Sequence, residues 1–97
     1  MTYDQMTGSA SCVLVEFYAT WCPHCRAMEP VMEQIGEMLE GKVKIVQLDI
    51  DSNEKAANAE RVTGTPTFIL YRDGRAVWRE SGEMPADTLL NKIMSHL

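Results

Sequence analysis

The chain has 97 residues, of which 45% are hydrophobic and 24% charged, and this suits one globular domain spanning residues 1–97. Its net charge of −5 argues against a nucleic-acid partner, and neither a basic patch nor a long apolar run indicates a membrane partner. The first residues lack the basic and apolar segments of a signal peptide, so we expect a cytoplasmic location, or a periplasmic or other extracytoplasmic one if a leader has been removed.

Seven elements are expected in the order β-α-β-α-β-β-α, because β-rich apolar segments alternate with segments of helical apolar spacing. The expected elements are strands at Cys12–Tyr18, Val43–Ile50, Thr67–Tyr71 and Arg75–Glu80, and helices that begin near Pro23, Asp51 and Pro85. Asp51 and Glu54 have the spacing of an N-cap and its third helical residue. Pro30 lies inside the first helix and is expected to kink it.

The connections between these elements predict a mixed sheet of about four strands. Each β-α-β connection is expected to join parallel neighbours, and the Asp73-Gly74 turn to join an antiparallel hairpin at the edge. The helices then have to cover both faces of the sheet. The fold class is therefore α/β with three layers.

The segment Trp21-Cys22-Pro23-His24-Cys25 carries the strongest chemical signal. Pro23 fits the first position of a helix, which places Cys22 at an exposed helix N-terminus and Cys25 one turn further in. Free N–H groups and the helix dipole favour a thiolate at Cys22, and Cys25 can resolve a mixed disulfide formed there. His24 is expected to tune the thiolate, because an imidazole can donate to it or carry charge near neutral pH; a merely solvated histidine is the alternative.

A zinc half-site is the other interpretation of two closely spaced cysteines. Structural zinc normally takes four ligands. The thiol and imidazole groups left to complete such a site are Cys12, His24 and His96, and the predicted topology does not gather them. We therefore favour a dithiol/disulfide redox site without a metal.

The sequence resembles the thioredoxin family along most of its length. The matching pieces, in family order, are VLVEFYATWCPHC, the helix proline Pro30, VQLDID, VTGTPTFILYRDG and Gly82. The resemblance implies a thioredoxin-like three-layer fold and thiol–disulfide exchange on protein substrates without a bound cofactor. For a cytoplasmic member it also implies recycling by a flavin-dependent reductase.

The chain departs from the family pattern in three places. Few residues precede Cys12, so the first family strand is expected to be missing and Val43–Ile50 to lie at a sheet edge. A monomer is expected, and pairing at that edge leaves a dimer open as an alternative. Pro-His between the cysteines is similar to the periplasmic disulfide oxidases, which implies a potential above that of a typical thioredoxin. Gln47 stands where the family usually has a lysine near the buried acid.

Glu16 stands at the position of that buried acid, in an apolar strand that leads to the cysteines. A buried carboxyl without a cation has a raised pKa and can carry protons. By resemblance it would accept the proton of Cys25 during resolution. The alternative is a carboxylate that reaches solvent at the end of the sheet.

The resemblance also implies a substrate groove beside the cysteines. Thr65-Pro66 matches the cis-proline loop, in which the residue before the proline pairs with an extended substrate. Gly82 matches the glycine that lets the substrate backbone approach, and Trp21 is expected to cover one side of Cys22. A non-catalytic module that holds peptides in this groove, or a metal carrier using Cys22 and Cys25, remain the alternatives to an enzyme.

Overall fold

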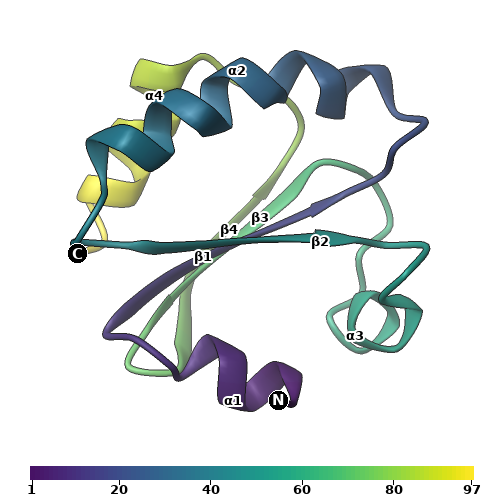
Figure 1. Ribbon diagram of the computed structural model, residues 1–97, viewed down its shortest axis with the longest axis horizontal. Helices are drawn as coiled ribbons and strands as arrows, with labels where there is room; N and C mark the ends of the chain where they lie inside the picture. The colour runs from purple at the N-terminus through teal and green to yellow at the C-terminus, as the bar shows by residue number, and fades with distance from the viewer.

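Three layers make up the protein, whose computed structural model describes residues 1–97 (Figure 1). The helices are α1 (Tyr3–Thr7), α2 (Pro23–Met38), α3 (Glu54–Ala59) and α4 (Ala86–Met94). The strands are β1 (Cys12–Tyr18), β2 (Lys44–Asp49), β3 (Thr67–Arg72) and β4 (Arg75–Ser81). Helices α2 and α4 cover one face of the sheet, and α1 and α3 cover the other, so the predicted three-layer α/β fold is confirmed.

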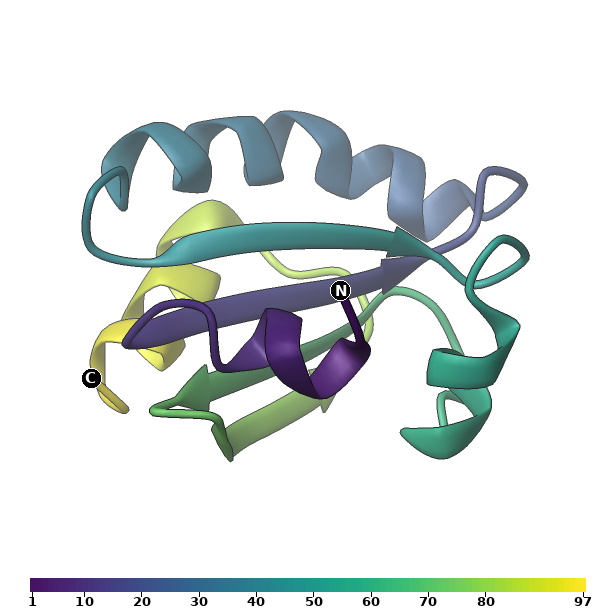
Figure 2. The same ribbon diagram turned by 60° about the horizontal axis from the view of Figure 1, so that its bottom comes forward.

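The four strands lie in the order β2-β1-β3-β4, with β2 and β4 at opposite edges (Figure 2). Strand β1 pairs in parallel with β2, and β3 pairs antiparallel with both β1 and β4. The edge position predicted for the second strand is confirmed. Asp73 and Gly74, with φ of 51° and 80°, form the predicted turn between β3 and β4.

The expectation that the second β-α-β connection joins parallel strands is wrong. Helix α2 has 16 residues, about 24 Å at 1.5 Å per residue, and returns the chain along the whole sheet. Helix α3 has only six residues, about 9 Å, whereas a six-residue strand runs for about 20 Å. The chain therefore stays at the end of the sheet where β2 finishes, and β3 leaves from that end in the opposite direction.

An N-terminal helix that was not predicted occupies the place before β1, and no strand precedes β1. Helix α1 begins with a capping box, in which the Thr2 hydroxyl accepts from the Gln5 N–H and the Gln5 side chain accepts from the Thr2 N–H. Its Tyr3 ring stacks on Phe17 of β1 with centroids 5.9 Å apart. The Thr-x-x-Gln spacing was the one sequence signal for this helix.

Helix α3 begins later than predicted. Asn53, not Asp51, is its N-cap, and no side chain caps the helix. The Asp51 side chain is instead engaged by Trp21, and its backbone N–H bonds to Asp49. Pro30 lies within α2 as expected, and the kink there stays a prediction.

The apolar core is split by the sheet into two clusters. The cluster under α2 and α4 is built around Leu14, Met28, Ile35, Phe68, Leu70 and Leu89. The cluster facing α1 and α3 contains Val13, Val15, Phe17, Ala57, Ile69 and Tyr71. Since side chains alternate along a strand, Glu16 points to the same face as Leu14, toward α2. The strand that carries this carboxyl is thus packed on both sides and held rigidly.

Candidate active site

The candidate site lies where β1 and β2 end, α2 begins and β3 starts. Cys22 and Cys25 form a small buried cluster with Ala19, against which Tyr18 and Ile50 pack. Both cysteines are free thiols and both are 5% exposed. The parallel pairing of Tyr18 with Asp49 brings the two strand ends together beneath α2.

Cys22 is the N-cap residue of α2, with Pro23 in the first turn as predicted. Its carbonyl accepts from the N–H groups of Cys25 and Arg26, both at 3.1 Å, and its thiol donates to the Thr65 carbonyl at 3.4 Å. The helix start is exposed at Pro23 and His24, as expected, but Cys22 itself is buried against Ala19 and Cys25, and its sulfur contacts the Thr65 carbonyl. Only a narrow part of this sulfur is open to a substrate.

The two sulfurs have opposite pKa shifts. Burial raises the pKa of the Cys22 thiol, but hydrogen bonds with the Thr65 side chain, with Cys25 and with backbone N–H groups at the helix start outweigh it, and the pKa falls to about 7. Burial dominates at Cys25 and raises the pKa of its thiol, and the neighbouring Cys22 raises it further. Near neutral pH, Cys22 is thus the sulfur that ionises.

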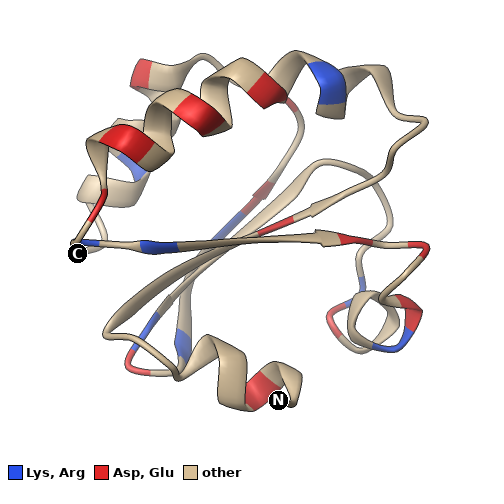
Figure 3. Ribbon diagram, in the orientation of Figure 1, with Lys and Arg blue, Asp and Glu red and all other residues tan.

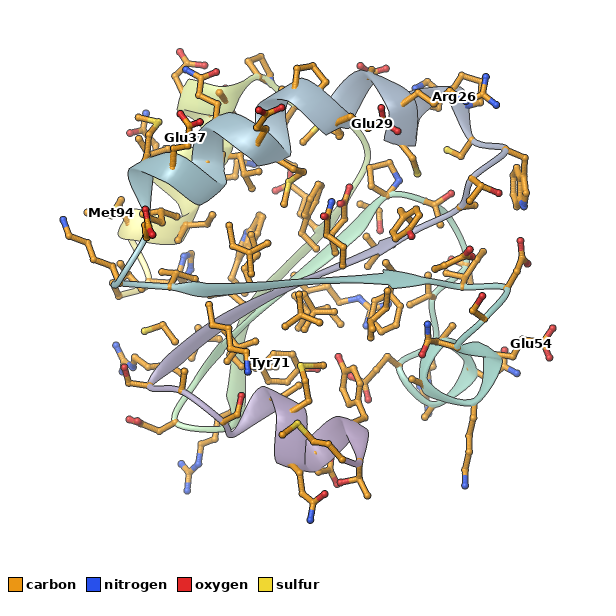
Figure 4. All side chains as sticks on the ribbon, viewed as in Figure 1. Arg26, Glu29, Glu37, Glu54, Tyr71 and Met94 are labelled. Atoms are coloured by element: carbon orange, nitrogen blue, oxygen red, sulfur yellow. The ribbon has the colours of Figure 1, made fainter.

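A cavity of about 270 Å³ lies behind Cys25, and we call it the rear cavity. Glu16 lines it from β1, and the Gln47 Nε2 donates to its Oε1 at 2.8 Å from the edge strand β2. Arg26 and Glu29 border the cavity from α2 (Figure 4). Polar walls and open space of this size can hold water between Glu16 and Cys25.

Glu16 as a whole residue is 2% exposed. Burial raises its pKa, the hydrogen bond from Gln47 opposes the rise, and the negative charge of Glu29 adds to it. The alternative of a solvent-reaching carboxylate is thereby excluded. The expected proximity of Gln47 to the buried acid is confirmed by their hydrogen bond.

The Thr65–Pro66 peptide bond is cis, as the resemblance implies. The Pro66 carbonyl accepts from the Gly82 N–H at 2.9 Å, which ties the segment after β4 to this loop. Gly82 has φ of 106°, a conformation that residues with a side chain rarely adopt. The structure therefore gathers Thr65, Pro66 and Gly82 beside Cys22.

Trp21 is 62% exposed and stands at the rim of a hollow of about 360 Å³, which we call the front groove. Cys22, Pro23 and His24 line the groove on one side, and residues 62–65 line it on the other. The indole Nε1 of Trp21 donates to Asp51 Oδ2 at 2.9 Å. Asp51, missed as a site residue by the sequence analysis, fixes the ring that borders the groove.

His24 is exposed and its imidazole is paired with Glu83. Nδ1 lies 2.6 Å from Glu83 Oε1, and the side chains of the two residues are 65% and 49% exposed. This hydrogen bond and the carboxylate charge raise the pKa of His24. The imidazole makes no hydrogen bond to Cys22; only the His24 backbone N–H does. Glu83 could not be predicted from the sequence, since it lies 59 positions from His24 and no local pattern marks it.

Charge is distributed so that the start of α2 stays free of acidic residues. Acidic side chains recur along α2 beyond its first turn, whereas Arg26 lies near its beginning (Figure 3). No three His, Cys, Asp or Glu side chains gather so as to hold a metal ion. None of the helices is long and apolar enough to cross a membrane.

The family model described as Thioredoxin matches residues 2–95. Thioredoxin Y, chloroplastic, of Oryza sativa subsp. japonica is 38% identical over 85 residues, which are 88% of this chain and 51% of that protein. Thioredoxin from Staphylococcus aureus is 38% identical over 84 residues, covering 87% of this chain and 81% of that one. The chain thus spans about half the length of the chloroplastic relatives and most of the bacterial one.

Solved thioredoxin structures are similar over nearly the whole chain. A mutant thioredoxin from Halobacterium salinarum superposes with a TM-score of 0.86 at 35% identity, over 96% of this chain and 80% of that one. Thioredoxin from Fasciola hepatica gives a TM-score of 0.88 at 31% identity, over 97% and 90% of the two chains. The architecture and the sequence therefore indicate the same family.

Proposed function

Because this chain belongs to the thioredoxin family, we propose that it is a thiol–disulfide oxidoreductase acting on disulfides and dithiols of other proteins. The observation that carries the proposal is the contrast between two adjacent sulfurs: the pKa of Cys22 is lowered to about 7 and that of Cys25 is raised. A nucleophile and a resolving thiol require this difference.

In the reductive direction, the Cys22 thiolate attacks one sulfur of a substrate disulfide. A mixed disulfide forms, and the other substrate sulfur leaves as a thiolate that takes a proton. Cys25 then loses its proton and attacks the Cys22 sulfur, so that the Cys22–Cys25 disulfide forms and the substrate is released as a dithiol. Two electrons pass from the cysteine pair to the substrate, and the oxidative direction reverses every step.

Glu16 is proposed as the acceptor of the Cys25 proton, through water in the rear cavity. Both groups line that cavity, and the raised pKa of Glu16 makes its carboxylate a stronger base than an exposed one. Trp21 and Thr65 are proposed to bind an extended segment of the substrate in the front groove, which they line. Pro66 and Gly82, which are joined by a hydrogen bond next to Thr65, are proposed to contact the same segment. The Thr65 carbonyl, which accepts from the Cys22 thiol, lies beside the sulfur that would attack the substrate.

We further propose that the pair is more oxidising than that of a typical thioredoxin, whose potential is about −270 mV. A stabilised Cys22 thiolate stabilises the reduced form, and this raises the potential of the disulfide. Pro23 and His24 are the residues proposed to tune it. Equilibration with glutathione measures the potential, and a value at or below about −270 mV would refute this part.

Insulin reduction by dithiothreitol tests the enzymatic proposal. The wild-type protein should accelerate it, and Cys22→Ser should abolish the acceleration. Cys12→Ser is the matched control, since Cys12 begins β1 and packs against the larger core cluster away from the pair. A wild-type protein that does not accelerate insulin reduction would contradict an oxidoreductase.

The front groove also supports a second candidate, a peptide-binding module without catalysis. Its hollow of about 360 Å³ beside Trp21 could hold an extended peptide without any reaction. That module would bind peptides equally well after Cys22→Ser and would not accelerate insulin reduction by dithiothreitol. A metal carrier would instead retain stoichiometric copper or zinc when purified under reducing conditions.

Recycling by a flavin-dependent reductase and a cytoplasmic location are proposals as well. The relatives include proteins named as chloroplastic and others from bacteria, so the compartment differs within the family. A monomer is the proposed state, and the free β2 edge is the surface that a strand-paired dimer would use. Sedimentation of the reduced protein distinguishes the two states.

A further inference from the structure

Glu83 is a charged residue at the site for which the reaction proposed above has no role. It lies between β4 and α4, directly after Gly82, whose N–H is bonded to the Pro66 carbonyl. That bond places the Glu83 carboxylate across from the first turn of α2. Its Oε1 lies 2.6 Å from His24 Nδ1.

The contact with Glu83 restricts the orientation of the His24 imidazole. Its Nδ1 is hydrogen-bonded to Glu83, and the Cys22 thiol is hydrogen-bonded to the Thr65 carbonyl. The neighbouring charged groups have other partners, because Asp51 is bonded to Trp21 and the Arg26 guanidinium to the Thr20 carbonyl. Of the titratable groups, only Glu83 and Cys22 act on the charge of His24.

We propose that Glu83 is a positioning residue that holds the His24 imidazole away from the Cys22 sulfur and so limits how oxidising the cysteine pair is. This inference rests on the proposed redox function. On this proposal, the effect of the Pro23-His24 pair on the potential also depends on Glu83, a residue outside the pair.

Removing the carboxylate frees the imidazole to turn toward Cys22 and donate to its thiolate. That hydrogen bond stabilises the reduced form. A smaller opposing effect arises because His24 without its partner is protonated less often at neutral pH, although the thiolate itself favours the imidazolium.

The experiment compares wild type, Glu83→Gln, His24→Ala and the double variant in equilibrium with glutathione. We expect Glu83→Gln to shift the equilibrium constant toward the reduced form by about three- to tenfold, which is about 15–30 mV. Ultraviolet absorbance of the thiolate should show a lower pKa of Cys22 in the same variant. In the His24→Ala background the effect should fall to less than half, because the carboxylate acts through the imidazole.

Glu37→Gln is the matched control, since it removes one exposed carboxylate from α2 well beyond the first turn. An unchanged potential in Glu83→Gln, or a shift of the same size without His24, would overturn the inference. A wild-type protein that never equilibrates with glutathione would instead contradict the proposed function, so the two failures are distinguishable.

Discussion

Replacing Glu16 with glutamine should make the protein more stable and less active. Glutamine has nearly the same shape and keeps an oxygen to accept the hydrogen bond from Gln47 Nε2. The new amide N–H groups can bond to water in the adjacent cavity of about 270 Å³. The substitution therefore removes the charge and leaves the packing nearly unchanged.

The size of the stability gain follows from the raised pKa of Glu16. Burial raises the pKa above the ordinary value of 4.5, so the unfolded chain releases this proton at a lower pH than the folded protein does. Below the unfolded pKa, Glu16 has no stability penalty. As the pH rises from the unfolded to the folded pKa, the wild type loses up to about 1.4 kcal/mol per pH unit, and above the folded pKa the loss stays constant.

Thermal denaturation of the reduced proteins across this pH range measures the effect. The advantage of Glu16→Gln over wild type should be smallest in acid and should grow toward neutral pH, with about 4–8 °C in melting temperature for each kcal/mol in a domain of this size. Glu33→Gln, at an exposed position of α2, is the control and should show no comparable growth. Two stability curves that run parallel at all pH values would refute the reasoning.

The same variant tests the proposed proton transfer. Without the carboxylate, resolution of the mixed disulfide should slow, because Cys25 has a raised pKa and loses its local base. Single-turnover kinetics follow this step directly. An unchanged resolution rate across the pH range would remove Glu16 from the mechanism while leaving its effect on stability intact.

Changes at Tyr71 and Trp21 should affect stability and substrate binding separately. Tyr71→Phe removes the contacts of its hydroxyl with Tyr3 at 2.7 Å and with Glu60 at 3.1 Å, between the sheet and α1, so urea denaturation should show a loss of about 1–3 kcal/mol (Figure 4). Trp21→Ala removes the apolar rim of the front groove and the bond to Asp51, and KM for protein disulfides should rise about tenfold, equivalent to about 1.4 kcal/mol. An unchanged free energy of unfolding in Tyr71→Phe would contradict the structural role of the Tyr71 hydroxyl. An unchanged KM with a lower kcat in Trp21→Ala would contradict a role of Trp21 in substrate binding.

The strands could be predicted from the sequence because their apolar segments are long and bounded by clear breaks. Cys12–Tyr18 is predicted to the residue, and each of the others differs by one residue at one or both ends. The direction of β3 was missed, because direction depends on the physical length of α3 and not on its presence. Helix α1 was missed because five residues are too few to show an apolar period.

The site residues that could be predicted are those whose role follows from a short sequence segment or from the family pattern. Cys22, Pro23 and Cys25 carry their chemistry in one segment, and the resemblance supplied Glu16 and Gln47. Asp51 and Glu83 could not be found in this way, since their partners Trp21 and His24 lie 30 and 59 positions distant. Such pairs can be identified only from the structure, in which β2, β3 and β4 place the loops that follow or precede them around the start of α2.

On the proposed mechanism, the order in which the cysteines react is decided by position along α2, because the two side chains are chemically identical. Cys22, at the N-cap, meets N–H groups that have no partner within the helix, and these stabilise a negative sulfur. Cys25, inside the first turn, faces a polar cavity that is also lined by the buried Glu16, and burial outweighs the hydrogen bond with the Ala19 backbone at its sulfur. If both cysteines lay one turn further along α2, neither sulfur would meet the free N–H groups of the helix start. Two intervening residues between the cysteines would therefore not be enough to make one of them a nucleophile. On this mechanism the cysteines carry out the exchange, the helix start makes one of them the nucleophile, and the acid behind it speeds resolution by the other.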